Sequence, residues 1–241
     1  MSAAIEVMRH HRSIRKFTEQ PLSAEQREAI MASAQAASSS SFLQASAVIR
    51  ITDPELRAKV MALCGDQAYI GTAAEFWVFC ADFHRHLQWV PEARTGFAEQ
   101  LLIGAIDTAL MGQNAMTAAE SLGLGGVFIG AVRNQPHALC ELLALPRGVV
   151  PLFGLCLGYP AQDPEPKPRL PASLMFVENR YPARFDDARM QGYDEQVRQY
   201  YRTRTGGNKE MTWTGQIGET LVKEARPFML EFLREQGFCL R

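Results

Sequence analysis

Residues 98–121 read AEQLLIGAIDTALMGQNAMTAAES and are followed, after a glycine-rich turn, by the apolar run 126–129. The first stretch predicts one long helix, in which alanine, glycine, leucine and methionine occupy nearly every face. A helix of this kind must be covered on several sides, by a sheet and, where the sheet does not reach, by another subunit. The short run after it predicts a strand.

Further apolar runs predict the rest of the sheet. They are rich in β-branched and aromatic residues, which is the composition of buried strands. The four predicted strands are Val48–Ile51, Phe76–Cys80, Gly126–Ile129 and Val149–Leu157. Because these strands alternate with helices, we expect one large α/β domain rather than a domain with a substantial excursion.

Two helices before the long one have clear starting signals. Ser23 and Gln26 form a capping box, and the helix that follows should extend to Ala37. Asp53 is an N-cap residue followed by Pro54, which is favoured in the first turn. Both helices are therefore predicted from local chemistry.

The C-terminal part of the chain differs in character from the strand-rich part. Five prolines between Pro160 and Pro171 predict an extended loop, and this loop carries Lys167 and Arg169. Beyond it we expect a charged, tyrosine-rich helix at Tyr193–Arg204, a turn at Thr205–Asn208, and a helix from Trp213 onward that is interrupted at Arg226–Pro227. This tail is expected to fold over the core.

The composition excludes a bulk attraction to nucleic acid or to a membrane surface. The chain of 241 residues has 25 basic and 26 acidic side chains and a formal net charge of -1, so any basic cluster must act locally. No apolar run reaches spanning length and no secretory signal is evident, so we expect a cytoplasmic protein. The five cysteines are scattered without a C-x-x-C pair, and we expect them to be buried thiols.

Two short segments gather side chains that suit a bound anion. They are His11-Arg12-Ser13-Ile14-Arg15 near the N-terminus and Lys167-Pro168-Arg169 in the proline-rich loop. The planar fork of arginine fits a phosphate or the pyrimidine edge of a flavin, and hydroxyl and backbone N–H groups fill the remaining positions. The alternative is a solvated basic patch, since short basic runs are common.

Two clusters of small residues are ambiguous. Four glycines follow the long helix, at Gly123, Gly125, Gly126 and Gly130. Their order, from helix into strand, is the reverse of a dinucleotide fingerprint, so they either let the backbone approach a planar ligand or make a tight turn. The serines at 38–41 either bond a ligand or partner chain or form a solvated loop.

Reactive side-chain constellations are scarce in this sequence. Cys80, His84 and His86 form a poor tetrahedral metal set. Asp107 and Glu120 lie 13 positions apart on the predicted long helix, which favours polar interruptions or interface contacts over a catalytic acid pair. No serine stands in a G-x-S-x-G nucleophile elbow. Anion-binding groups without a reactive constellation are best explained by a cofactor that carries the chemistry.

Six motifs are distributed over nearly the whole chain. They are His11–Arg15, Ser38–Gln44, Ala74–Asp82, Gly123–Gly126, Pro151–Cys156 and Lys167–Pro171. Together they resemble the flavin-dependent NADPH nitroreductase family. The resemblance implies an α+β fold with a mixed sheet surrounded by helices, in one domain over 1–241 whose tail from about 186 is a helical excursion covering the active site. It also implies an intertwined homodimer with one FMN per subunit at the interface.

The resemblance also assigns roles at the FMN site. His11, Ser13 and Arg169 would hold the phosphate, while Arg15 and Lys167 would face the N1/O2 edge of the ring. Backbone from Phe128 to Ala131 would run along the flavin toward N5, and Ser39 would come from the other subunit. The implied cofactor set is His11, Arg12, Ser13, Ile14, Arg15, Ser39 (from the partner), Gln67, Ala68, Tyr69, Phe128, Ile129, Gly130, Ala131, Lys167, Pro168 and Arg169.

Substrate and NADPH contacts are implied in the same way. The residues that would border the substrate pocket are Ser41, Phe42, Lys223 and Arg226. Arg204 would bind the NADPH phosphate. Two positions depart from the family pattern. Ala131 stands where glycine is common and narrows the space beside the flavin, and Lys209 stands where an arginine often helps, so a bidentate contact becomes a point charge.

The function implied by the resemblance is two-electron transfer from NADPH to a nitroaromatic compound, a quinone or a flavin by a ping-pong mechanism. The chemistry would lie on FMN, with no catalytic side chain and no metal, nucleic acid or membrane partner. The alternatives are an NADPH-dependent FMN reductase, whose true acceptor is free flavin, and a flavin-binding sensor module without turnover.

Overall fold

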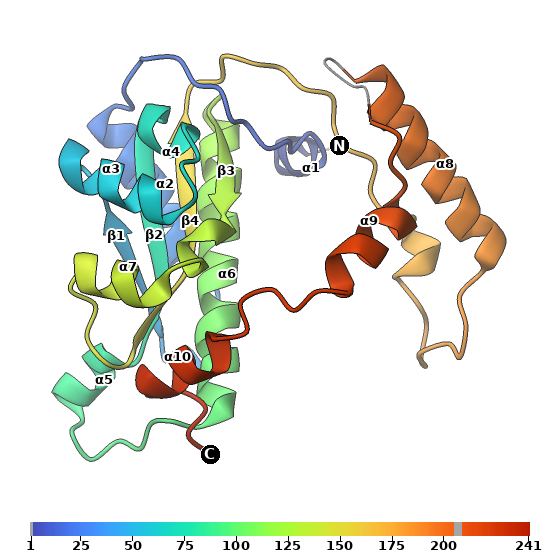
Figure 1. Cartoon of the computed structure of the whole chain (residues 1–241). Coiled ribbons are helices and arrows are strands. Elements are labelled where there is room, and N and C mark those ends of the chain that lie inside the picture. The colour runs from blue at the N-terminus through green and yellow to red at the C-terminus, as the bar shows by residue number, and fades with distance from the viewer. Residues whose placement is uncertain (1, 205–208) are drawn as a thin grey trace. The chain divides into compact units, whose positions relative to one another are not determined.

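The chain forms two compact units in the computed structural model, which describes residues 2–204 and 209–241 (Figure 1). The first unit contains the residues up to Asp163 together with Arg226–Arg241, and the second is Pro164–Ala225. The expected division, one domain with a helical tail from about 186, stays a prediction. The second compact unit begins earlier, at Pro164.

The first unit is built on a four-stranded sheet in the order β1-β2-β4-β3. The strands are β1 (Ser46–Arg50), β2 (Glu75–Asp82), β3 (Gly125–Ile129) and β4 (Val149–Gly158), each close to its predicted run. The α+β class is confirmed, but the expected mixed sheet is not. All strand pairs in the described part of the chain are antiparallel. Strand direction depends on how each connection crosses the sheet, which the composition of a strand does not specify.

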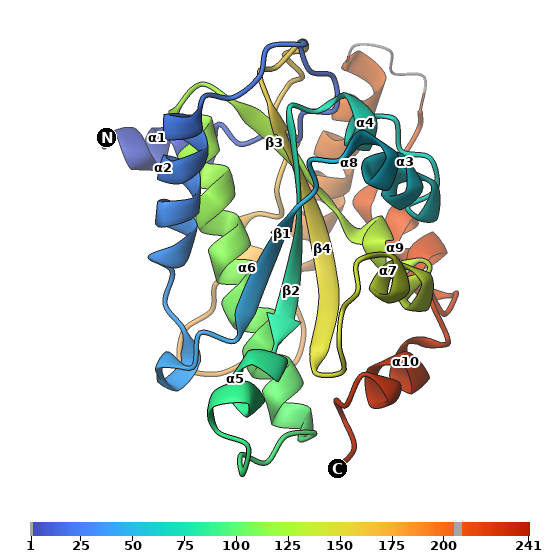
Figure 2. The same ribbon diagram turned by 90° about the vertical axis from the view of Figure 1, so that its left-hand side faces the viewer.

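Helices cover both faces of this sheet (Figure 2). One face packs against α2 (Ala24–Gln35) and α6 (Ala98–Ser121), and the other against α3 (Pro54–Leu63), α4 (Tyr69–Thr72) and α7 (Pro136–Leu142). Strand β2 is buried along its whole length, with Phe76 and Val78 in one core cluster and Trp77 and Phe79 in the other. Its continuous apolar run therefore fills two cores by the alternation of a strand.

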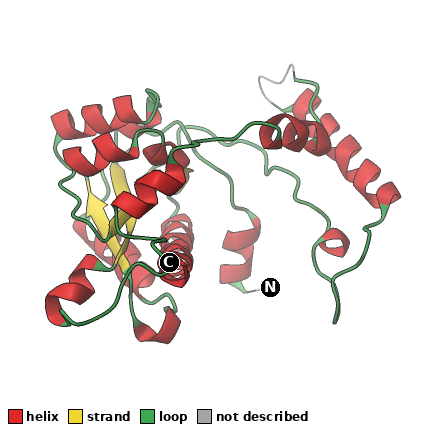
Figure 3. Cartoon of the chain, turned by 60° about the horizontal axis from the view of Figure 1, so that its bottom comes forward, coloured by secondary structure: helices red, strands yellow, loops and turns green. Residues whose placement is uncertain are grey.

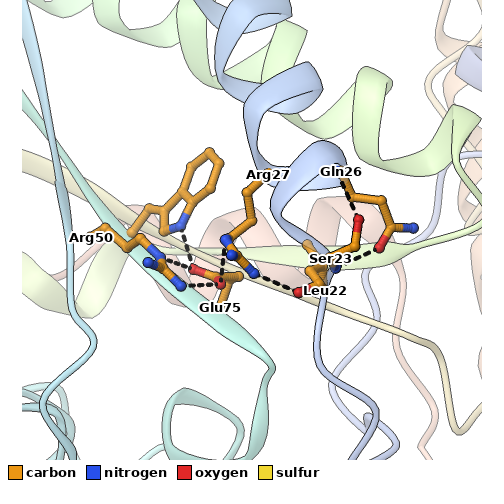
Figure 4. A network of polar contacts seen from close by, with 7 residues as sticks. Leu22, Ser23, Gln26, Arg27, Arg50 and Glu75 are labelled. Atoms are coloured by element: carbon orange, nitrogen blue, oxygen red, sulfur yellow. Dashed lines mark hydrogen bonds and ion pairs between the residues drawn. The ribbon is translucent and has the colours of Figure 1, made fainter.

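A buried carboxylate ties α2 to this sheet (Figure 4). Glu75 is 4% exposed and accepts two hydrogen bonds from the guanidinium of Arg50, at 2.6 and 2.7 Å. The indole of Trp77 donates to the same carboxylate at 2.9 Å, and Arg27 of α2 lies 3.7 Å away. The start of α2 is the predicted capping box of Ser23 and Gln26. This network fixes the end of β1, the start of β2 and the start of α2.

Helix α6 has the predicted bounds and approaches the sheet closely. A Cβ at Gly104 would lie 2.8 Å from Ala81, and one at Gly112 would lie 2.7 Å from the ring of Phe153. On another side the helix exposes an apolar stripe, in which Leu102, Ile106 and Leu110 are 56%, 55% and 45% exposed. The fold of one chain therefore leaves part of this apolar helix uncovered.

The remaining short elements of the first unit complete its surface. They are α1 (Ala3–Arg9), η1 (Ser40–Phe42), α5 (His84–Trp89), η2 (Gly130–Arg133) and α10 (Met229–Glu235). Four of the five cysteines are buried and none of the five is in a disulfide; burial raises the pKa of Cys64 and of Cys140 to about 11. Within the described ranges, no helix is long and apolar enough to span a bilayer.

The second unit is helical and carries no strand in its described residues (Figure 3). It contains η3 (Ala172–Leu174), α8 (Asp187–Thr203) and α9 (Trp213–Leu221). Helix α8 begins six positions before the predicted Tyr193, because Asp186 caps it by accepting a hydrogen bond from the backbone N–H of Arg189. The break at Arg226–Pro227 is confirmed. The predicted turn at 205–208 lies outside the described residues.

Candidate functional site

The N-terminal anion-binding segment is anchored to the sheet by its one apolar member. Ile14 is 3% exposed, and its backbone N–H donates to the carbonyl of Gly126 at 2.9 Å. A Cβ at Gly125 would lie 2.5 Å from the Ile14 side chain, so this glycine is required for the contact. In extended backbone, neighbouring side chains point away from a buried one. Ser13 and Arg15 are therefore displayed outward.

His11 forms a short polar contact with a side chain of α6. Its Nδ1 lies 2.6 Å from Oε1 of Glu120, near the end of α6. A carboxylate oxygen accepts, so Nδ1 carries the proton and Nε2 is left for another partner. The Glu120 side chain is 12% exposed. The sequence predicts a polar interruption or an interface contact at Glu120, and the structure pairs this side chain with His11.

Arg12 is held by protein groups rather than standing free. Its Nη1 donates to the carbonyl of His10 at 3.1 Å, and its Nη2 pairs with Asp163. Its Nε is buried and has no hydrogen-bond partner in the described part of the chain. A cavity of about 380 Å³ lies here, lined by Glu6, Val7, His10, Arg12, Ile14, Glu120, Gly123, Leu124, Gly125 and Pro160.

The turn after β3 brings a candidate cofactor position and a candidate substrate position together. Arg226 donates to the carbonyl of Gly130 at 3.4 Å and to the side-chain oxygen of Asn134 at 2.7 Å. Phe128 is 37% exposed. Arg133 adds a second guanidinium beside this turn, where burial, and then the charge of Arg226, lowers its pKa. Asn134 and Arg133 were not singled out from the sequence, because neither forms a recognisable motif.

The predicted ring-edge position Gln67 lies just before α4. The hydroxyl of Tyr69 donates to the Gln67 carboxamide oxygen at 2.5 Å. This contact orients the side chain and leaves its amide N–H groups to face a ligand. Ala68, between them, is exposed.

The serine-rich loop is held by Asp107 of α6. The Ser40 backbone N–H and hydroxyl both donate to its carboxylate, at 3.0 and 3.1 Å. Ser41 and Phe42 have left-handed backbone, with φ of 49° and 58°, and Phe42 is 82% exposed. Asp107 and Glu120, the residue that contacts His11, are 13 positions apart on α6, or about 20 Å at 1.5 Å per residue. Within one chain, this loop is therefore not brought to the His11 segment.

In the second unit, two of the predicted ligand-binding side chains, both cationic, lie over one aromatic ring. Lys167 Nζ lies 5.2 Å and Arg204 Cζ lies 5.3 Å from the ring centroid of Tyr201. The hydroxyl of Tyr193 donates to the carbonyl of Pro168 at 3.1 Å. Burial raises the pKa of Tyr193, and the nearby charge of Arg169 opposes this shift. A cavity of about 390 Å³ is lined by Lys167, Pro168, Arg169, Leu170, Tyr193, Trp213, Gln216, Ile217, Thr220 and Leu221.

Two other predicted site residues lie apart from these clusters. Lys209 and Lys223 are exposed. Within residues 2–204 and 209–241, no hydrogen bond, ion pair or ring contact joins either lysine to another candidate residue. Both stay predictions, together with the rest of the implied ligand contacts.

Comparison with known proteins gives full-length similarity. Residues 8–159 match the model of the nitroreductase family, and residues 167–241 match its C-terminal domain. The chain is 56% identical to the oxygen-insensitive NADPH nitroreductase of Salmonella typhimurium, with 100% of both chains covered. It is 42% identical to an FMN reductase (NADPH) of Bacillus subtilis, covering 99% of each. The solved structure of a Vibrio harveyi NADPH:FMN oxidoreductase complexed with NAD+ has a TM-score of 0.93, 44% identity and 100% coverage of both chains.

Proposed function

Because this chain belongs to the nitroreductase family, we propose that it uses FMN to transfer two electrons from NADPH to nitroaromatic compounds or quinones by a ping-pong mechanism. It is an enzyme, an NADPH-dependent flavin-linked oxidoreductase. The observation that carries the proposal is the 56% identity to an NADPH nitroreductase over the full length of both chains.

The donors of the N-terminal segment fit the phosphate of FMN. The anchoring of Ile14 displays Ser13 and Arg15 on the same side, and the contact of Nδ1 with Glu120 leaves Nε2 of His11 available to a ligand. The buried Nε of Arg12 also lacks a partner in the described residues. Imidazole, hydroxyl and guanidinium donors are the groups that bind phosphate oxygens.

The remaining contacts of the proposed FMN site supply charge and orientation. When bound, FMN supplies the hydride acceptor and the relay of two electrons. Arg15 and Lys167 are proposed to face the pyrimidine edge of the ring, where cations stabilise negative charge, and Arg169 to bind the phosphate. Gln67, oriented by Tyr69, would address the same edge through its amide.

The proposed acceptor pocket is bordered by Lys223 and Arg226 and by Ser41 and Phe42, which the serine-rich loop of the second copy would supply. Two contacts support it: the hydrogen bonds of Arg226 to Gly130 and Asn134, which hold its guanidinium at the turn where the flavin is proposed to lie. The exposure of Phe42 leaves its ring available to contact a planar acceptor. Ala131, 8% exposed, keeps the backbone N–H that the proposal needs.

We propose a homodimer in which each site uses residues of both chains. The apolar stripe Leu102, Ile106 and Leu110 is uncovered in one chain, which favours burial against a second copy. The loop that carries Ser39 is held about 20 Å along α6 from the His11 contact, so its contribution would go to the partner's site. The cytoplasmic location expected from the sequence also stays a prediction.

The test is spectroscopic. The purified protein should be yellow, with about one FMN per chain that is released by heating and filtration. Under anaerobic conditions NADPH should bleach the bound flavin, and a nitroaromatic compound or quinone should restore its absorbance. A colourless protein that takes up no added FMN would overturn the proposal, and bleaching without restoration by any acceptor would favour a sensor module.

A second candidate function is FMN reduction, since one relative at 42% identity is named an FMN reductase (NADPH). Both functions use the same donor and the same bound cofactor, so only the acceptor separates them. Comparison of kcat/KM for free FMN, a nitroaromatic compound and a quinone at saturating NADPH decides which acceptor this enzyme prefers.

A further inference from the structure

Helix α8 presents three tyrosines on one side. They are Tyr193, Tyr200 and Tyr201, half of the six tyrosines in the chain. Positions seven and eight residues apart lie on one face of a helix. Tyr193 and Tyr201 are 5% and 7% exposed, within the core cluster of the second unit. The rings of Tyr193 and Tyr201 are therefore buried although α8 is otherwise a charged helix, and the contacts of the three tyrosines explain this burial.

All three tyrosines contact the loop that carries Lys167 and Arg169. The Tyr193 hydroxyl donates to the carbonyl of Pro168 at 3.1 Å, and the Tyr200 hydroxyl donates to the carbonyl of Glu165 at 3.4 Å. The ring of Tyr201 lies under Lys167 Nζ at 5.2 Å. Each contact falls within the five residues 165–169.

The composition of this loop explains why it needs external support. Proline has no backbone N–H and cannot contribute a donor to a turn or a ladder. Pro164, Pro166 and Pro168 therefore leave the segment with few hydrogen bonds of its own, and it has no regular secondary structure. The hydroxyls of α8 satisfy carbonyls that the loop cannot pair internally.

Tyr201 has a second cation on its ring. Arg204 Cζ is 5.3 Å from the Tyr201 centroid and 6.0 Å from that of Tyr200. A cation within about 6 Å of a ring centroid is attracted by the ring quadrupole. The side chain proposed to bind the NADPH phosphate and the one proposed to face the flavin edge are thus both positioned by one aromatic ring.

We infer that Tyr193 and Tyr201 are positioning residues for cofactor recognition. Tyr193 fixes the backbone of the loop through Pro168, and Tyr201 holds Lys167 for the flavin and Arg204 for the nucleotide. This inference rests on the proposed function. Both tyrosines act through other residues, Tyr193 through the backbone of the loop and Tyr201 through the side chains of Lys167 and Arg204, and neither is assigned a contact with substrate.

The two tyrosines act through different atoms, which makes the test specific. Tyr201→Phe keeps the ring, and Tyr201→Leu removes it, so only the leucine variant should raise the Kd for FMN and the KM for NADPH, each by about fivefold or more. The KM for NADH should stay within about twofold, because NADH lacks the 2′-phosphate. At Tyr193 the phenylalanine variant already loses the hydroxyl, so Tyr193→Phe should raise the Kd for FMN and leave the ratio of the two KM values unchanged.

The matched control is Tyr181→Leu. Tyr181 is 81% exposed in the same unit and its ring contacts Phe185, so this change should leave all three constants within about twofold. Equal losses in Tyr201→Phe and Tyr201→Leu would overturn the inference, because the ring would then not be the active feature. Equal losses with NADPH and NADH would overturn the part that concerns Arg204.

A second measurement does not depend on turnover. The chain has five lysines, and reductive ¹³C-methylation keeps their charge. One dimethyl-lysine signal should be displaced upfield by the ring current of Tyr201. It should vanish in Lys167→Met, remain in Tyr201→Phe and lose its displacement in Tyr201→Leu. No displaced signal in the unsubstituted protein would overturn the inference, whereas a displaced signal in a protein that binds no flavin would overturn the proposed function instead.

Discussion

Glu120 faces His11 at 2.6 Å, although the two residues are 109 positions apart in the chain. A carboxylate that accepts a hydrogen bond from one ring nitrogen fixes the proton on that nitrogen and the orientation of the ring, as carboxylates also do for metal-bound histidines. For this reason, the affinity of the proposed phosphate site should depend on an acid that does not itself bind the phosphate.

The prediction at this site is a loss of phosphate recognition in Glu120→Gln. Its Kd for FMN should rise by about fivefold, equivalent to about 1 kcal/mol, with no change for riboflavin, which has no phosphate. Glu6→Gln is the control, because Glu6 lines the same cavity and its substitution by glutamine removes the same negative charge. A parallel loss for FMN and riboflavin, measured by fluorescence titration, would instead indicate a general disturbance of the fold.

Arg204 should determine the preference for NADPH over NADH. Arg204→Ala should raise the KM for NADPH by about tenfold or more, equivalent to roughly 1.4 kcal/mol, and leave that for NADH almost unchanged. Lys209→Ala should have a smaller effect, because an ammonium offers a point charge rather than a bidentate fork. Steady-state kinetics with both nucleotides at fixed low salt test this, and losses of equal size would show that these residues do not recognise the 2′-phosphate.

At the scale of elements, the close approach of α6 to the sheet depends on its glycines. In a helix interior, alanine is more favourable than glycine by about 1 kcal/mol. At Gly112, however, a Cβ would lie 2.7 Å from the Phe153 ring. Overpacking of this kind costs about 1–3 kcal/mol, so we expect Gly112→Ala to lower the free energy of unfolding.

The matched control is Gly192→Ala on α8, where a Cβ would meet nothing within 4 Å. There the gain in helix propensity should dominate, and the protein should be unchanged or stabilised by up to about 1 kcal/mol. Guanidinium unfolding of both variants measures the difference. Stabilisation by Gly112→Ala would mean that α6 can move away from β4 at little cost.

At the scale of the whole molecule, the uncovered stripe of α6 predicts a dimer that a single charge can disrupt. Ile106 is 55% exposed in one chain, and burying an unpaired carboxylate in its place would cost several kcal/mol. Ile106→Glu should therefore sediment as a monomer at micromolar concentration and lose most of its FMN.

The control for this experiment is Lys59→Glu, on the exposed side of α3, which covers the opposite face of the sheet. It should remain a dimer and keep its flavin. A monomeric unsubstituted protein that retains a full complement of FMN would contradict the shared site.

The sequence by itself determined the features that depend on neighbours along the chain. The capping box of Ser23 and Gln26 and the cap at Asp53 involve residues within three positions, and the bounds of α6 follow from its composition. The alternating and continuous apolar runs located all four strands because burial imposes a period of two or a fully apolar stretch. Asp186 was a usable cap signal for the earlier start of α8.

Only the tertiary structure decided the contacts between distant positions. Strand direction, the pairing of His11 with Glu120, the hold of Asp107 on the serine loop and the meeting of Arg226 with Gly130 all join segments separated by tens of residues. Such contacts depend on how the connections cross the sheet and on which faces pack together, and no local periodicity encodes them. The residues of the candidate site could be named from motifs, but the groups that orient them became visible only in the folded chain.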